Sequence, residues 1–138
     1  MLQMVQSRGL ADAIRVESAS THAYHIGNEP DRRSQTHALR RGYDLSALRA
    51  RKVTVEDFQR FDHVLAMDAE NLASLASRCP PAYRRRVGLF MQHARRFHGQ
   101  QEVPDPYDGG AAGFEQVLDY VEDACAGLID AIHVQSAP

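Results

Sequence analysis

One aspartate, Asp105, stands in a setting where a carboxyl group could do acid chemistry. It lies in the run 103–107, and two glycines follow that run closely. Pro106 restricts the backbone of Asp105 toward extended geometry, which would help to aim the carboxyl group. The alternative is a loop aspartate that only forms a turn with Pro106 and the glycines. Tyr107 comes directly after this pair and could pack against an aromatic ligand or against the protein.

The cysteines and histidines of this chain do not indicate a catalytic or metal-binding site. Cys79 and Cys125 each stand alone, and we interpret the seven histidines as surface or strand residues rather than metal ligands. We therefore expect no metal, no cofactor and no disulfide. Cys79 and Arg85 do have C-x5-R spacing, but Pro80 and Pro81 remove amide donors and no glycine allows a phosphate close to the backbone. We predict that Cys79 is not a nucleophile.

Short strand signals alternate with helical ones along the chain. Strands are predicted at 15–19, at 62–67 and, less clearly because of Gly88, at 86–90. Alternation of this kind is typical of an α/β domain with a mostly parallel sheet.

Capping residues and the spacing of apolar residues predict where the helices lie. A helix over 32–41 should end at Gly42, Thr54 and Asp57 resemble a capping box, and Asp68 is the expected N-cap of a helix over 69–77. The last helix is the clearest, because apolar residues recur every three or four positions and form one stripe: Phe114, Val117, Leu118, Val121, Cys125, Leu128 and Ile129. Cys125 is therefore expected to be a buried structural thiol.

Length and charge limit the possible functions. The 138 residues suit one domain, which we place at 1–132, with a frayed tail at 133–138. The net charge of −2 indicates no nucleic-acid partner, and no stretch is long enough to span a membrane. Two isolated cysteines fit a reducing cytoplasm.

Several segments resemble segments of the low-molecular-weight protein-tyrosine phosphatases, in particular of the bacterial members, and they follow one another along the chain in the same order as in that family. The acid-loop and final-helix segment 103–119 is the most specific of them. The others are 17–21, 26–31, 49–58 and 61–72. Together they cover the chain from about Gly9 to Leu128.

The resemblance implies a set of site residues. Asp105 would be the general acid that protonates the leaving phenol, and Tyr107 and Tyr24 would be aromatic walls for phosphotyrosine or a small aryl phosphate. Ser18 and Asn71 would support the phosphate-binding loop. Each residue also has an ordinary explanation, since a tyrosine often only packs, Ser18 ends a strand and Asn71 lies in a first helical turn.

One part of the family pattern is missing from this sequence. Members of the family begin with an apolar strand that leads into a C-x5-R-[ST] loop, and this sequence contains neither. It also has Leu48, Asp108 and Ser20 where relatives usually have histidine, tyrosine and glycine. We expect a three-layer, doubly wound parallel sheet without its first, central strand, and a start codon at Met1 that is assigned too late.

This absence leads to expectations about activity and assembly. As written, the chain should be inactive, and its open sheet edges should favour self-association. Two alternatives remain. One is a non-catalytic relative that binds phosphorylated or acidic partners; the other is arsenate reduction, which would need further redox cysteines.

Overall fold

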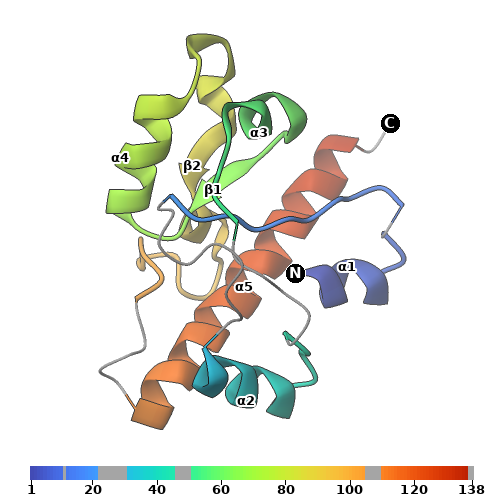
Figure 1. Ribbon diagram of the computed structural model, residues 1–138. Coiled ribbons are helices and arrows are strands. Elements are labelled where there is room, and N and C mark those ends of the chain that lie inside the picture. The colour runs from blue at the N-terminus through green and yellow to red at the C-terminus, as the bar shows by residue number, and fades with distance from the viewer. Residues whose placement is uncertain (11, 22–30, 46–50, 105–109, 137–138) are drawn as a thin grey trace.

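The computed structural model describes residues 1–10, 12–21, 31–45, 51–104 and 110–136. Strands and helices alternate from residue 64 onward, as the sequence predicted, whereas within these ranges the three helices before it have no strand between them. Their bounds in chain order are α1 Leu2–Ser7, α2 Arg32–Arg40, α3 Val55–Arg60, β1 Val64–Ala66, α4 Ala69–Arg78, the 3₁₀ helix η1 Pro81–Arg86, β2 Val87–Leu89, the 3₁₀ helix η2 Phe90–His93, and α5 Gly110–Ser136. Figure 1 shows α2 beside the N-terminal part of α5, and the two strands with α3 and α4 at the other end of the molecule.

The two strands pair in parallel, with Val64 opposite Val87 and Ala66 opposite Leu89. Both lie inside the segments predicted as strands, 62–67 and 86–90. Successive side chains of a strand point to opposite faces. In agreement, Val64 and Ala66 pack with α3 and α4, whereas Leu65 packs with α5. The described sheet therefore lies between two helical layers, which confirms the α/β class.

The predicted strand at 15–19 was wrong. Only Ser20, one residue later, forms a bridge, and its partner is Lys52. A strand exists only through a partner, and no described residue forms a backbone hydrogen bond with residues 15–19. Glu17 in this segment instead forms ion pairs with Arg15 and with Arg60 of α3. Among the described residues, the sheet therefore has two strands rather than the three that the sequence predicted.

The predicted helix caps are present. Gly42 has φ of +88° and follows the C-cap of α2, where the N–H of Tyr43 donates to the carbonyl of Ala38 at 2.9 Å. This left-handed conformation is readily available only to glycine. The carboxylate of Asp68 accepts from the N–H of Asn71 at 2.7 Å and so begins α4.

The last helix, α5, supplies much of the hydrophobic core on one face of the sheet. Its apolar stripe packs on η2, and Gly127 lies so close to the backbone of His93 that a β-carbon would come within 1.9 Å of the His93 carbonyl oxygen. The helix continues to Ser136, into the segment 133–138 where we expected fraying. Gly and Pro are absent between residues 128 and 137, so the sequence offers the helix no earlier terminator.

Candidate active site

Three segments that are distant in the sequence meet beyond the carboxyl end of β1. They are Ser20 with Thr21, the start of α4 after Met67, and the residues that lead to the range 105–109. In open α/β sheets, ligands bind outside the carboxyl ends of the parallel strands. This edge is therefore the candidate site.

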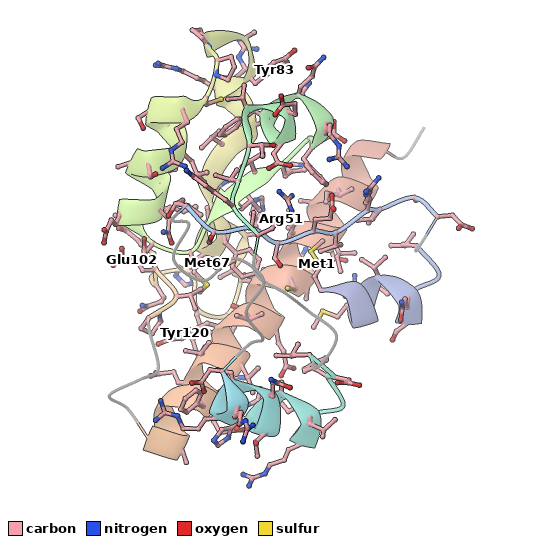
Figure 2. All side chains as sticks on the ribbon, viewed as in Figure 1. Met1, Arg51, Met67, Tyr83, Glu102 and Tyr120 are labelled. Atoms are coloured by element: carbon pink, nitrogen blue, oxygen red, sulfur yellow. The ribbon has the colours of Figure 1, made fainter. Side chains whose placement is uncertain are left out.

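The chain leading to Asp105 is fixed at this edge by two hydrogen bonds. The N–H of Val103 donates to the carbonyl of Met67 at 2.7 Å. The carboxylate of Glu102 accepts from the N–H of Ala69, in the first turn of α4, at 2.6 Å. Figure 2 shows Met67 and Glu102 on the same side of the molecule, near the start of α4. The backbone is therefore anchored two residues before Asp105.

The predicted acid and aromatic residues lie outside the described part of the chain. Asp105 and Tyr107 fall in the range 105–109, and Tyr24 falls in 22–30. Described elements border both ranges, since α2 begins at Arg32 and α5 begins at Gly110.

Asn71 reaches this edge, but its partner is Thr21. The side-chain amide of Asn71 donates to the hydroxyl of Thr21 at 3.2 Å, and the guanidinium of Arg78 donates to the Thr21 carbonyl at 3.0 Å. Thr21 is buried by these contacts. Sequence reasoning missed Thr21, although it ends a run of small polar residues just after the predicted strand. Ser18 is exposed, and no hydrogen bond within the described residues joins it to Asn71.

An ion pair behind this edge holds Ser20 in place. Arg51 donates to both carboxylate oxygens of Asp57, at 2.9 and 3.1 Å. The Arg51 carbonyl accepts from the N–H of Ser20 at 2.7 Å, and the Ser20 carbonyl accepts from the N–H of Val53 at 2.8 Å. The Arg51 guanidinium, together with the N–H and hydroxyl of Thr54, holds the pKa of Asp57 below its usual value, against the opposing effect of burial.

A second ionic cluster joins α2 to α5. Arg41 donates to the carboxylates of Glu122 and Glu115 and also pairs with Asp119. His37 Nδ1 lies 2.6 Å from Glu115 Oε2, and the His37 ring is stacked on Phe114. The carboxylates of Glu122, Glu115 and Asp119 raise the pKa of Arg41, with Glu122 as the main cause, against the opposing effect of burial. These contacts also fix, relative to each other, the two helices that follow the ranges 22–30 and 105–109.

Comparison with known proteins identifies the family. The sequence matches the family model described as low molecular weight phosphotyrosine protein phosphatase over residues 1–137. The chain belongs to this phosphatase family. The Synechocystis protein slr0328 is 41% identical over 133 residues, which are 96% of this chain and 83% of that protein. The human low molecular weight phosphotyrosine protein phosphatase is 31% identical, with 95% of this chain and 82% of the human protein covered.

A solved phosphatase structure agrees with this family in fold. The crystal structure of a protein tyrosine phosphatase from Entamoeba histolytica, with Hepes in its active site, has a TM-score of 0.92 and 34% identity to this chain. The match covers 99% of this chain and 86% of the Entamoeba chain. The family predicted from the sequence is confirmed, and it is a family of hydrolases.

Neither thiol of this phosphatase chain lies where a nucleophile would be needed. Cys79 is buried at the C-cap of α4, the opposite end of that helix from Asn71, and its thiol donates to the carbonyl of Pro80 at 3.3 Å. Arg85 is exposed in η1. Cys125 is buried in α5, and burial raises the pKa of its thiol. Both cysteines are core residues in this fold.

Two other features are absent from the described part of this phosphatase chain. No three His, Cys, Asp or Glu residues there are close enough together to hold a metal ion. Among the described helices, none is both long and apolar enough to cross a membrane.

Proposed function

We propose that this chain carries the general-acid side of a phosphotyrosine phosphatase site, with Asp105 as the acid. The observation that carries the proposal is the hydrogen bond between the N–H of Val103 and the carbonyl of Met67. It holds the chain two residues before Asp105 at the carboxyl end of β1, where parallel α/β sheets bind ligands. Pro106 then restricts Asp105 to extended geometry.

The acid meets a definite chemical need. A phenolate, with a pKa of about 10, is a poor leaving group at neutral pH. A carboxylic acid that gives its proton to the phenolic oxygen as the P–O bond breaks typically contributes about 10²–10⁴-fold in rate. In this proposal, Tyr107 and Tyr24 flank the phenyl ring, which favours phosphotyrosine proteins or small aryl phosphates as substrates.

The nucleophile, in this proposal, lies outside these 138 residues. Cys79 and Cys125 are buried in the core, and the sequence contains no other cysteine. Ser18 and the edge built on Asn71 and Thr21 would support the phosphate-binding loop once that loop is present. The 138-residue chain alone should therefore not hydrolyse an aryl phosphate.

The unpaired backbone of residues 15–19 supports the proposal that one strand of the sheet is missing from this chain. Its backbone has no hydrogen-bond partner among the described residues, and neither does the edge of β1 that faces away from β2. A strand placed between them would complete a sheet of the doubly wound type. Without that strand, a second copy of the chain could pair with the same edges.

Activity measurements test the proposal directly. The 138-residue chain is assayed with p-nitrophenyl phosphate and phenyl phosphate beside a longer form that includes the in-frame codons upstream of Met1. We expect turnover only from the longer form, and we expect those codons to encode a C-x5-R-[ST] loop. Thiol-dependent turnover by the 138-residue chain, or upstream codons without such a loop, would contradict the proposal.

The role of Asp105 has its own test in the longer form. Asp105→Asn should lower kcat about 10²–10⁴-fold for phenyl phosphate and less for p-nitrophenyl phosphate, whose leaving group needs a proton less. Asp108→Asn is the matched control, because it makes the same change three residues away. Equal losses in the two variants, or a loss that does not depend on the leaving group, would exclude Asp105 as the acid.

Assembly and location are the last parts of the proposal. We expect the 138-residue chain to self-associate and the protein to reside in a reducing compartment such as the cytoplasm, which suits two unpaired cysteines. Light scattering after size exclusion measures the first point. A monodisperse monomer with high thermal stability would count against open sheet edges.

A further inference from the structure

A pocket of about 390 Å³ opens between α3 and the C-terminal end of α4. Its lining residues are Lys52, Val53, Thr54, Val55, Phe58 and Arg78. This volume lies within the range of roughly 300–1,000 Å³ that is typical of small-molecule sites. Ser18 and Asn71, the two described residues of the proposed catalytic set, are not among these lining residues.

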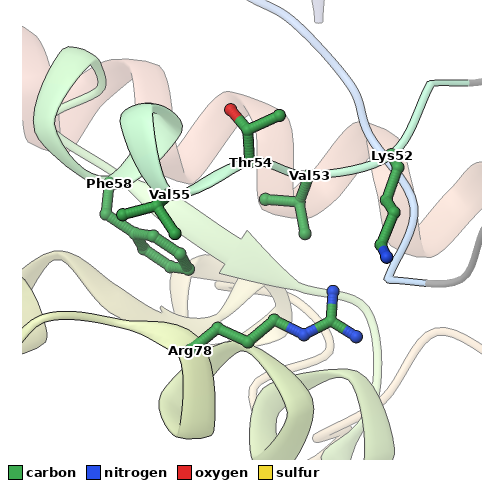
Figure 3. A pocket seen from close by; sticks show the side chains of 6 residues that line it. All are labelled: Lys52, Val53, Thr54, Val55, Phe58 and Arg78. Atoms are coloured by element: carbon green, nitrogen blue, oxygen red, sulfur yellow. The ribbon is translucent and has the colours of Figure 1, made fainter.

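Two cationic side chains converge on one side of this pocket. Figure 3 shows the ammonium of Lys52 and the guanidinium of Arg78 approaching each other from opposite walls. No carboxylate among the described residues forms an ion pair with either group. Like charges brought together in this way attract an anion, and an arginine fork suits carboxylate and phosphate groups.

The backbone of Lys52 and the guanidinium of Arg78 are each held by the segment that contains Ser20 and Thr21. Lys52 is bridged to Ser20. Arg78 donates one N–H to the carbonyl of Thr21 at 3.0 Å, which fixes the guanidinium and leaves its other donors for a ligand. The side-chain nitrogen of Lys52 has no hydrogen bond or ion pair with a described residue. An anion placed between the two groups would therefore displace no described partner of Lys52.

The remaining walls are apolar. Phe58 is 0% exposed, Val53 is buried, and both side chains point toward Arg78, whereas Thr54 turns its hydroxyl away. Val55 is 57% exposed, which makes it one of the few large apolar side chains that the described surface presents to solvent. A ligand body that covered Val55 would remove that apolar surface from water.

We propose that this pocket binds a small organic anion. Its carboxylate or phosphate group lies between Lys52 and Arg78, and its apolar body, of about the size of a phenyl ring, lies against Val55 and the partly accessible Val53, above the buried Phe58. The site goes beyond the proposed function, because it needs neither Asp105 nor a nucleophilic cysteine.

Amide NMR titration of the 138-residue chain tests this site. Benzoate and phenylphosphonate are the probes, with benzyl alcohol as the neutral analogue and acetate and inorganic phosphate as anions without the apolar body. We expect both aromatic anions to shift the amides of Val53, Thr54 and Phe58 saturably, and to bind at least about three-fold more tightly than any of the three comparators. Added salt should weaken binding.

Variants assign the binding to the two cations. Lys52→Gln and Arg78→Gln should each weaken benzoate binding about two- to ten-fold, whereas Arg85→Gln removes an equal charge from an exposed position outside the pocket and should change it less than about two-fold. Asp105→Asn should not change it. That variant therefore separates this site from the proposed active site.

Three results would overturn the proposal. They are an absence of saturable shifts in the pocket amides, benzyl alcohol binding as tightly as benzoate, and Lys52→Gln binding benzoate as well as the wild type does. If Arg78→Gln perturbs folding through the lost contact with Thr21, Lys52→Gln decides alone, because its side chain has no described polar partner.

Discussion

Replacing Asp57 should loosen the edge that carries the candidate site. Its carboxylate is 3% exposed, accepts two hydrogen bonds from Arg51, and accepts from the N–H of Thr54 at 2.8 Å. Losing a helix-capping contact costs about 1 kcal/mol, and losing a charge-assisted pair to a buried carboxylate costs about 2 kcal/mol when one partner is partly exposed. We expect Asp57→Ala to lower the free energy of unfolding by about 3 kcal/mol and the Tm by roughly 10 °C.

The dependence on pH distinguishes the carboxylate charge from simple packing. The pKa of Asp57 is lowered in the folded chain, chiefly by hydrogen bonds from Arg51. A lowered pKa stabilises the fold above the unfolded value of about 3.9, and this stabilisation is lost as the pH falls through the folded pKa. The difference between the wild type and Asp57→Asn should therefore be constant from pH 7 to about pH 5 and shrink below about pH 4.

Urea unfolding followed by circular dichroism at pH 7 and pH 3 measures both effects. Glu56→Gln is the matched control, because Glu56 is the neighbouring carboxylate on α3, is exposed, and has no described ion pair. It should change the free energy of unfolding by less than about 0.5 kcal/mol. A loss below about 1 kcal/mol for Asp57→Ala, or an Asp57→Asn difference equal at both pH values, would refute the reasoning.

Two further predictions concern the packing of α5. Gly127→Ala should lower the free energy of unfolding by about 1–3 kcal/mol in urea titrations, because its β-carbon would meet the carbonyl oxygen of His93 at 1.9 Å. Gly99→Ala, with open space around it, should be near neutral, and equal losses in both variants would contradict this account. The carboxylate of Asp123 accepts from three successive N–H groups at 95–97, so Asp123→Ala should cost about 1–2 kcal/mol and increase amide hydrogen exchange there. Unchanged exchange at 95–97 would show that the carboxylate does not hold this turn.

Local signals in the sequence predicted the helices well. Gly42 ends α2, the Thr54–Asp57 pair begins α3 and Asp68 begins α4, all as expected, and the stripe on the last helix is buried at Phe114, Cys125 and Ile129. These features depend on hydrogen bonds and side-chain spacings within a few residues, which the sequence specifies directly. The family was also recognisable, because its motifs are short contiguous runs.

Features that depend on distant partners needed the tertiary structure. Residues 15–19 have strand-like composition but no ladder, because a strand forms only where another strand lies beside it. The hydrogen bond from Asn71 to Thr21, fifty residues earlier in the chain, likewise appears only in the folded chain.

The sequence by itself determined which helices form, where most of them begin and end, and that the chain resembles the phosphatase family but has no C-x5-R-[ST] motif. Only the tertiary structure decided that Val103 is held at Met67 and that Lys52 and Arg78 share a pocket. The reason is physical. Caps and helical stripes are short-range and are encoded in consecutive residues, whereas contacts between residues tens of positions apart exist only once the chain has packed.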